Sequence, residues 1–408
     1  MAHRHGSGTT HVESGAGWAE DKPRTIDTRV ARPRAILAAV EPTRQPAAAL
    51  DPPWSTDESL DELAQLAATG DIEVVGRISQ RLPVANPRTY FGEGKAQELK
   101  AWLEAEECDI ALFDDELTPN QQKSLEAVLG AGRVVDRTQL ILDIFAARAH
   151  TREGTLQVEL ARAQYQIPRL RRLWTHLERQ RGGTFTRGGA GETQMETDRR
   201  VLRATVKRLE RELDAVRERR AERRRNRHEV APTVALVGYT NAGKSTLLNA
   251  LTGAQVGTRD QLFATLDPTT RRWNPTPDRV ALLTDTVGFI HKLPASLVAA
   301  FRATLEEATE ADLLLHVVDA SSPHAAGQAA VVLDELETIG AGAPVVSVLN
   351  KIDVLPGEQR AALLQDLCAT FPDGVPVSAR TKEGLDRLAQ RVSAALAALH
   401  PATVAMRH

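Results

Sequence analysis

The sequence has very little cysteine, no long apolar run and almost no net charge. Its two cysteines, Cys108 and Cys368, are too few for a disulfide framework or a multi-cysteine metal site, which favours a reducing compartment. No stretch approaches the ~18 apolar residues of a membrane-spanning helix, and residues 1–10 lack the hydrophobic region of a signal peptide. We therefore expect a soluble, cytoplasmic protein.

The near-zero net charge argues against a polyanion partner only when it is averaged over the whole chain. Lysine and arginine number 51 against 54 aspartate and glutamate, for a net charge of −3. Residues 1–168 hold 18 basic and 26 acidic side chains, residues 169–228 hold 19 and 9, and residues 229–408 hold 14 and 19. A basic middle segment thus lies between two acidic parts, and it is the segment that suits a polyanion such as RNA.

The length of 408 residues predicts two or three domains at ~150 residues each, and no internal repeat is visible. Residues 1–33 are rich in Gly, Ser, Thr, His and Arg without periodicity, which predicts a disordered tail. His3, His5 and His11 could bind a metal ion there, but we favour a solvated tail.

Residues 34–150 alternate short apolar runs with helical stretches, as a small α/β domain does. The expected strands cover 36–40, 72–75 and 110–113, and the expected helices lie near 60–68 and 96–105.

Residues 151–230 carry two heptad patterns, which predict an antiparallel helical hairpin. The patterns are formed by Leu156, Leu160, Ala163, Ile167, Leu170, Trp174 and Leu177, and by Leu202, Val206, Leu209, Leu213 and Val216. The glycine-rich stretch 181–191 forms the expected tip, and Pro168 should kink the first helix or split it in two. A second helix over 194–225 would be on the order of 48 Å long, so this arm should extend well beyond a compact domain.

Residues 231–400 return to alternating strands and helices, which predicts a doubly wound, mainly parallel sheet. The expected strands cover 234–237, 280–284, 313–318 and 345–349, with a last one near 375. The whole chain is therefore expected to be α/β, with a small N-terminal α/β domain, a helical hairpin arm and a C-terminal phosphate-loop domain.

The segment Gly238-Tyr-Thr-Asn-Ala-Gly-Lys-Ser245 fits the phosphate-loop pattern and lies between an expected strand and an expected helix. Backbone N–H groups of such a loop surround the phosphates, Lys244 reaches the terminal ones, and Ser245 can ligate magnesium. The loop alone does not distinguish ATP from GTP.

The segment Asn350-Lys-Ile-Asp353 follows a strand and favours guanine. The Asp353 carboxylate can accept from both the ring N–H and the exocyclic amine of guanine, a donor pair that adenine lacks. An ordinary strand-to-helix turn is the alternative. Ser378-Ala-Arg380 after the next strand supports the guanine interpretation, because the backbone at Ala379 would meet the base carbonyl.

The magnesium side of the site is predicted from two further segments. Asp285-Thr-Val-Gly288 supplies an acid for magnesium and an N–H group at Gly288 that faces the terminal phosphate. Residues 263–271 are the expected switch segment, in which Thr265 is the preferred magnesium ligand and Thr269 and Thr270 are its rivals.

Together these segments define the expected site. The residues expected to bind the nucleotide are Gly238, Tyr239, Thr240, Asn241, Ala242, Gly243, Lys244, Ser245, Thr246, Phe263, Ala264, Thr265, Leu266, Asp267, Asp285, Thr286, Val287, Gly288, Asn350, Lys351, Asp353, Ser378, Ala379 and Arg380. The residues expected to act on the reacting phosphate are Lys244, Thr265 and Gly288, and the expected magnesium ligands are Ser245, Thr265 and Asp285.

In this order the motifs resemble those of translation-factor-related GTPases, over roughly residues 232–398. Members of that class often carry glutamine after Asp-x-x-Gly to orient the attacking water, whereas this sequence has Phe289, which cannot hold a water. In the subclass with a hydrophobic residue there, the resemblance implies that a potassium ion or a partner replaces the glutamine. Asn241 resembles the potassium-coordinating asparagine of that subclass, with an asparagine that stabilises the turn as the alternative.

Further segments resemble the HflX family of ribosome-associated GTPases and extend the likeness over nearly the whole chain after the tail. These segments are Tyr90–Lys95, Phe113–Leu117, Asp136–Ala146, Thr151–Gly154, Leu156–Leu160 and Gly191–Arg200. The resemblance implies an arm whose glycine-rich tip enters the large ribosomal subunit near the peptidyl-transferase centre, and a GTPase that splits stalled or stressed ribosomes. It also implies ATP binding or RNA unwinding by the N-terminal domain in some members.

Three features depart from the family pattern or fall short of it. Gly92-Glu-Gly-Lys95 lacks the spacing of a phosphate loop, so we favour a structural or RNA-contacting turn over an ATP site. The family tip usually has the sequence Arg-Gly-Pro-Gly-Glu, whereas here Arg187-Gly-Gly-Ala-Gly-Glu192 lacks the proline and is one residue longer. The chain stops soon after the last expected helix, so we expect no C-terminal extension of the kind that some members carry.

Two functions remain open from the sequence. Bound GTP and magnesium would order residues 263–271 and 285–292, and hydrolysis would release them, which could change how the arm sits on the ribosome. The first hypothesis is a slow, ribosome-stimulated GTPase, monomeric by default, that binds the large subunit and dissociates ribosomes. The second is a nucleotide-gated RNA-binding module that acts in ribosome assembly or storage with little turnover.

Overall fold

The computed structural model describes residues 32–43, 54–180, 190–228, 231–254, 261–294, 297 and 306–399. The predicted N-terminal tail, up to residue 31, and residues 181–189 of the predicted tip lie outside the described residues. Side chains are not described over 170–196, at 198 and over 220–228.

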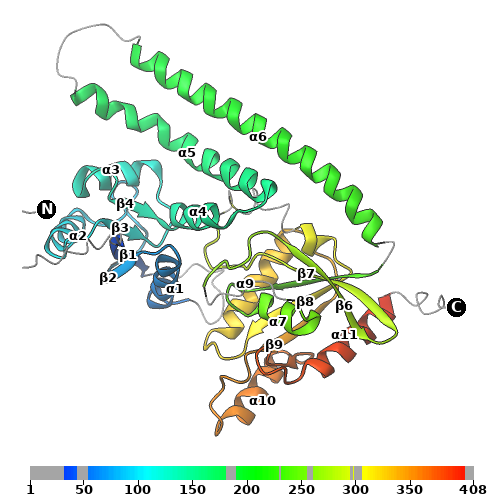
Figure 1. Cartoon of the computed structure of the whole chain (residues 1–408). Helices are drawn as coiled ribbons and strands as arrows, with labels where there is room; N and C mark the ends of the chain where they lie inside the picture. The colour runs from blue at the N-terminus through cyan, green and yellow to red at the C-terminus, as the bar shows by residue number, and fades with distance from the viewer. Residues whose placement is uncertain are drawn as a thin grey trace, which may run out of the picture. The chain divides into compact units, whose positions relative to one another are not determined.

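A four-stranded parallel sheet with the strand order β2-β1-β3-β4 forms the centre of the N-terminal part (Figure 1). Its strands are β1 (Arg34–Pro42), β2 (Glu73–Leu82), β3 (Ile110–Phe113) and β4 (Val134–Asp136), and its helices are α1 (Thr56–Thr69), α2 (Glu93–Ala105), α3 (Pro119–Leu129) and α4 (Arg137–Arg148). Helices α1 and α3 each begin with a capping box, formed by Ser55 with Glu58 and by Thr118 with Gln121. Elements α3, β4 and α4 complete the α/β alternation beyond the last strand that the sequence analysis identified.

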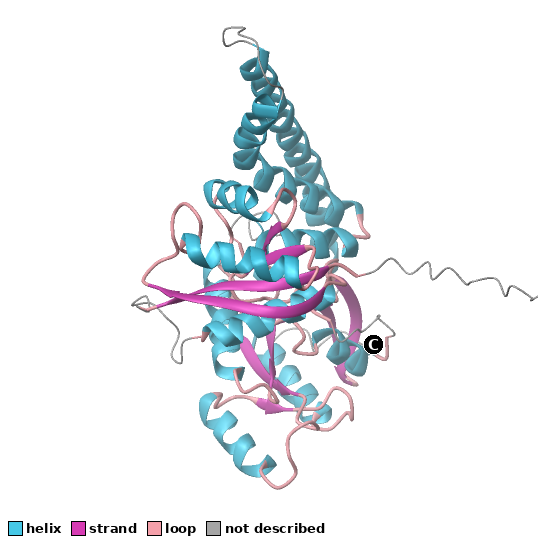
Figure 2. Cartoon of the chain, turned by 90° about the vertical axis from the view of Figure 1, so that its left-hand side faces the viewer, coloured by secondary structure: helices cyan, strands magenta, loops and turns pink. Residues whose placement is uncertain are grey.

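Two long helices follow, α5 (Arg152–Gln180) and α6 (Ala190–His228), and they lie side by side in Figures 1 and 2. Leu156 and Leu160, near the start of α5, form a buried cluster with Leu209 and Leu213 in the second half of α6. The two helices therefore run antiparallel, with these heptad positions between them, whereas the side chains of Leu170, Trp174 and Leu177 lie outside the described residues. Helix α5 continues through Pro168, so the first helix is not split there.

The C-terminal part contains a six-stranded sheet with the strand order β10-β9-β8-β5-β7-β6. Its strands are β5 (Thr233–Gly238), β6 (Thr269–Thr276), β7 (Arg279–Asp285), β8 (Leu313–Asp319), β9 (Val345–Asn350) and β10 (Val375–Pro376), and its helices include α7 (Lys244–Thr252), α9 (Ala325–Thr338), α10 (Arg360–Thr370) and α11 (Leu385–Leu399). Strand β6 pairs antiparallel with β7 and the other neighbours pair parallel, so the predicted α/β class with mainly parallel sheets is confirmed. The expected switch segment extended to residue 271, but the chain is already part of strand β6 from Thr269 onward.

The N-terminal and C-terminal parts share apolar packing. One cluster of buried residues includes side chains from α1, α4 and α5 together with Leu262, Phe263 and Leu266 of the C-terminal part. The ring of Phe263 meets that of Phe145 edge to face, with the ring centroids 4.6 Å apart. The chain segment that precedes β6 is therefore held between the two parts. Among the described residues, no helix is both long and apolar enough to cross a membrane.

Candidate nucleotide-binding site

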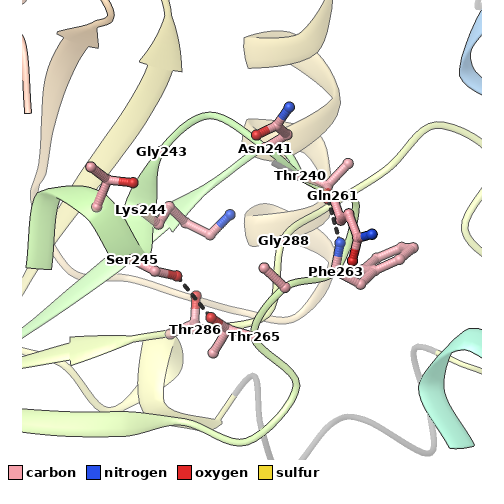
Figure 3. Close-up of a pocket in the computed structure, with 12 residues that line it drawn as sticks. Thr240, Asn241, Gly243, Lys244, Ser245, Gln261, Phe263, Thr265, Thr286 and Gly288 are labelled. Carbon is pink, nitrogen blue, oxygen red and sulfur yellow. Dashed lines mark hydrogen bonds between the residues drawn. The ribbon is translucent and has the colours of Figure 1, made fainter. Parts of the chain in front are cut away.

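The loop between β5 and α7 forms one side of a pocket at the carboxyl end of the parallel strands (Figure 3). The pocket is lined by Thr240, Asn241, Gly243, Lys244, Ser245, Thr246, Gln261, Phe263, Ala264, Thr265, Thr286 and Gly288. The buried Lys244 donates from Nζ to the carbonyl oxygens of Gly238 and Tyr239, at 3.1 and 2.9 Å. Burial lowers the pKa of Lys244 to about 8, although the nearby Asp285 opposes this.

Three oxygen-bearing side chains meet beside the first turn of α7. Ser245 Oγ and Thr265 Oγ1 lie 2.8 Å apart, and both donate to Asp285 Oδ2, at 2.5 and 2.8 Å. The second carboxylate oxygen, Asp285 Oδ1, is buried and has no hydrogen-bond partner among the described residues. Burial raises the pKa of Asp285, and the Lys244 ammonium opposes that rise. Two hydroxyls and a carboxylate with an unused buried oxygen are a donor set that suits a small hard cation such as Mg²⁺.

The segment that follows β7 is hydrogen-bonded to the phosphate loop. Phe289 N–H donates to Gly238 O at 3.1 Å, and Thr240 N–H donates to Phe289 O at 2.7 Å. Glycine is required at position 288, because a Cβ there would lie 2.7 Å from Thr240 Cα and 2.9 Å from Lys244 Nζ. The Phe289 side chain is 2 % exposed and belongs to the core, so it does not line the pocket.

The segment before β6 contributes hydroxyl and backbone groups to the pocket, and other side chains turn away from it. Phe263 N–H donates to Thr240 Oγ1 at 2.9 Å, while the Phe263 ring points away from the pocket (Figure 3). The Asp267 carboxylate faces the start of α5, where Oδ2 accepts from the N–H of Thr151 at 3.0 Å. Thr270, a rival of Thr265 in the sequence analysis, instead pairs with Thr284 across β6 and β7, with their hydroxyl oxygens 3.0 Å apart.

The residues expected to bind guanine form a second cluster at the same edge of the sheet. Asn350 donates from Nδ2 to Ala242 O at 2.9 Å, and its Oδ1 accepts from Ala379 N–H at 3.0 Å, so it connects the phosphate loop to the segment that follows β10. Ser378 Oγ donates to Asp353 Oδ1 at 2.7 Å, which fixes the orientation of that carboxylate.

Two supporting residues lie outside the predicted set. Gln261 lines the pocket, and Asp319 accepts from Lys351 Nζ at 2.7 Å. Asp319 could have been found from its place at the carboxyl end of a buried strand, where polar residues commonly serve the site. We find no comparable sequence signal for Gln261.

The glycine-rich turn of the N-terminal part begins a helix. Gly92 is the N-cap of α2, and its N–H donates to Gln80 Oε1 at 2.8 Å. Lys95 forms an ion pair with Glu98 one turn further along, at 2.9 Å. These contacts suit the structural alternative for this turn.

Three family models match consecutive parts of the chain. They are described as GTP-binding GTPase N-terminal, over residues 57–146, GTP-binding GTPase middle region, over 148–227, and 50S ribosome-binding GTPase, over 233–351.

Two relatives are similar over most of the chain. GTPase HflX of Magnetococcus marinus is 49% identical over 370 residues, which cover 89% of this chain and 82% of the relative. GTPase HflX of Escherichia coli is 45% identical over 339 residues, which cover 82% and 78%. A GTP-binding protein from Sulfolobus solfataricus, solved in complex with GDP, is 24% identical with a TM-score of 0.44, over 90% of this chain and 99% of that one.

Proposed function

The chain belongs to the HflX family of GTPases, and from this premise we propose that it binds the large ribosomal subunit and dissociates stalled or stressed ribosomes. It is a GTP-binding protein whose C-terminal part carries a ribosome-binding GTPase domain. The match of that domain to the family model of ribosome-binding GTPases is the observation that carries the proposal.

In this proposal Mg²⁺ is held by Ser245, Thr265 and Asp285, whose oxygens already converge in the pocket. When bound, the ion neutralises charge on the phosphates. Lys244 and the N–H of Gly288 contact the terminal phosphate in the same scheme.

Guanine recognition is assigned to the second cluster. Asp353 accepts from the base, and the backbone N–H of Ala379 lies beside the base carbonyl. The contacts of Asn350 to Ala242 and Ala379 support this assignment, because they fix the distance between the phosphate loop and the base-binding edge.

Phe289 cannot orient the attacking water, because its side chain is buried in the core. We therefore propose that Asn241, which lines the pocket, would hold a potassium ion that replaces the missing glutamine, or that a group on the ribosome would replace it. Asn241 has a left-handed backbone with a φ of 59°, a conformation that asparagine tolerates well, so its role in the turn is compatible with either assignment.

The three domains of the proposal are residues 34–150, 151–230 and 231–400, with the hairpin of α5 and α6 as the arm that contacts ribosomal RNA. The basic excess of residues 169–228 supports this role for the arm. The alternative function is a nucleotide-gated RNA-binding module with little turnover. The buried Phe289 favours this alternative.

Single-turnover GTP hydrolysis, measured with and without large subunits in potassium or sodium buffer, separates the two functions. We expect large subunits to stimulate hydrolysis and potassium to exceed sodium in effect. The absence of stimulation by subunits would contradict the ribosome-acting enzyme and leave the RNA-binding module. Gradient co-sedimentation in GTP, GDP, ATP and a non-hydrolysable GTP analogue then shows which nucleotide state binds whole ribosomes or large subunits.

A further inference from the structure

The backbone of His291, three residues after Gly288, is held by side chains from the C-terminal and the N-terminal parts of the chain. Its N–H donates to the hydroxyl oxygen of Tyr239, which belongs to the phosphate loop, at 2.8 Å. Its carbonyl oxygen accepts from Nη1 of Arg137, the first residue of α4, at 2.8 Å. Both backbone hydrogen-bonding groups of this residue are therefore fixed, the N–H by the loop and the carbonyl oxygen by the N-terminal domain.

Arg137 is 1 % exposed, and two carboxylates compensate its buried charge. Glu62 of α1 lies 2.6 Å from Nη1, and Asp114, just after β3, lies 3.0 Å from Nη2. The Tyr239 hydroxyl donates to the second oxygen of Glu62, so Glu62 connects the two groups that hold the backbone of His291. A guanidinium can make these contacts at once because its donors are arranged as a rigid planar fork.

The next residue, Lys292, enters the same network. Its ammonium lies 2.5 Å from Asp114 and 2.6 Å from Asp115, and Asp115 also accepts from the Tyr90 hydroxyl at 2.5 Å. Burial alone would raise the pKa of Asp114, but Arg137 and Lys292 lower it to about 2, so this carboxylate stays charged.

These N-terminal residues come from segments that the nucleotide pocket does not use. Tyr90, Asp114, Asp115 and Arg137 belong to the segments Tyr90–Lys95, Phe113–Leu117 and Asp136–Ala146, and none of them lines the pocket. Their common feature is contact with the chain just after Gly288, directly or through one carboxylate.

We propose that Arg137 is a positioning residue for GTP hydrolysis, which acts by fixing the backbone of His291 and hence the place of Gly288 beside the terminal phosphate. Phe289, directly after Gly288, is bonded to the phosphate loop, and the backbone of His291 two residues further along is fixed as well, so Gly288 has little freedom to shift. The N-terminal domain is thereby part of the apparatus that hydrolyses GTP. This inference rests on the proposed role of Gly288 and not on any action at the ribosome.

The test uses the full chain without ribosomes, so its outcome is independent of the proposed ribosomal function. Tyr239→Phe removes one hydroxyl without changing the shape of the loop, and Arg137→Lys keeps the charge without the fork. Arg169→Lys is the matched control, because Arg169 is another largely buried arginine paired with a carboxylate, Asp136, and its hydrogen bonds to Gln122, Tyr165 and Leu117 also lie in the N-terminal half. The readouts are the single-turnover rate, the dissociation constant for a fluorescent GTP analogue, and the unfolding midpoint.

Tyr239→Phe is expected to lower the hydrolysis rate about fivefold, as the loss of one hydrogen bond would, with GTP affinity changed less than about twofold. Arg137→Lys should lower the hydrolysis rate by about tenfold or more, since small displacements of a catalytic group greatly reduce the rate. Arg169→Lys should leave the rate unchanged. A wild-type hydrolysis rate in a folded Arg137→Lys variant would overturn the proposal. If that variant fails to fold, a rate at or above the wild-type value in Tyr239→Phe would overturn it instead.

Discussion

At the scale of single residues, the proposed base selectivity depends on one carboxylate whose orientation is fixed. Asp353 accepts from Ser378 Oγ at 2.7 Å, so its remaining acceptor capacity faces a defined direction. Asp353→Asn places an amide N–H₂ group where guanine presents donors of its own. We expect GTP affinity to fall by about 10- to 100-fold, since hydrogen bonds to charged groups contribute about 1.5–3 kcal/mol.

Competition binding with GTP, ATP and xanthosine triphosphate checks this expectation. Xanthine carries a carbonyl in place of the exocyclic amine, so the variant should lose its preference for GTP and gain affinity for the xanthine nucleotide. Unchanged selectivity for GTP over ATP would refute the assignment of Asp353 to the base.

The buried His316 should make the free energy of unfolding depend on pH. His316 in β8 is 1 % exposed, and neither ring nitrogen has a hydrogen-bond partner among the described residues. Burial, with a smaller effect of Lys244, lowers its pKa to about 4. An unfolded histidine titrates near 6.5, so the unfolded chain binds the proton more readily as the pH falls. The contribution of neutral His316 to the free energy of unfolding is fully present above about pH 6.5. Up to roughly 3 kcal/mol of this free energy is lost as the pH falls to 4.

Urea unfolding of the wild type and of His316→Gln, at pH values from 7.5 to 4, isolates this contribution from that of the carboxylates. The free energy of unfolding of the wild type should decline more steeply than that of the variant. Parallel curves would show that His316 does not titrate differently in the folded chain.

The residues of the nucleotide site could be predicted where each motif is contiguous in the chain. The phosphate loop and the Asn350–Asp353 segment place their groups by local backbone geometry, so spacing alone is enough to propose them. Tyr239 was expected only as a loop residue, but its hydroxyl also reaches Glu62, 177 positions away. Contacts of this kind depend on how the two domains pack, which no local pattern encodes.

At the scale of whole elements, a pair of glycines shows how the arm is attached to the site. Gly94 in α2 has no atom within 4 Å of the place where a Cβ would lie, whereas a Cβ on Gly154 in α5 would lie 2.6 Å from Asp267 Oδ1. Asp267 also accepts from the N–H groups of His150 and Thr151 at the start of α5. The beginning of the arm thus depends on a residue two positions after Thr265.

Gly94→Ala should raise the free energy of unfolding by up to about 1 kcal/mol, because alanine favours a helix and meets nothing there. Gly154→Ala should lower it by about 1 kcal/mol, because Asp267 must move and give up its bonds to the helix start. Chemical denaturation of both variants measures the difference. Equal stabilisation by the two changes would show that Asp267 does not constrain this turn.

The main elements could be predicted from periodicity, but those with weaker signals were missed. Helix α3 has a capping box at Thr118 and Gln121, a signal that could have identified it. Strand β6 lies at the edge of the sheet and has a polar sequence. Its first residues were expected to belong to the switch segment, because the extent of this strand is determined only by its pairing with β7. Pro168 did not end α5, so this helix accommodates the one backbone hydrogen bond that a proline cannot donate.

At the scale of the whole molecule, the near-zero net charge divides into a basic arm between two acidic domains, and α6 shows where that charge is exposed. Arg200, Arg203, Lys207 and Arg211 are exposed and spaced three or four residues apart, so they form a stripe on one face of the helix. The buried Leu209 and Leu213 lie on the opposite face, against α5. The arm can therefore keep its helical packing while it presents this stripe to a polyanion.

Replacing these four residues with glutamine is expected to weaken binding to large subunits and to make it less sensitive to salt. If each contacts one phosphate, the slope of log affinity against log salt should fall by roughly 3. Gradient co-sedimentation at several potassium concentrations, in a non-hydrolysable GTP analogue, measures both effects. The matched control replaces four exposed basic residues of the GTPase domain, Arg271, Arg272, Arg387 and Arg391. GTP affinity should stay unchanged in both variants, because neither set lines the pocket. An equal loss of ribosome affinity in the control would mean that overall charge, and not this face of the arm, attracts the ribosome.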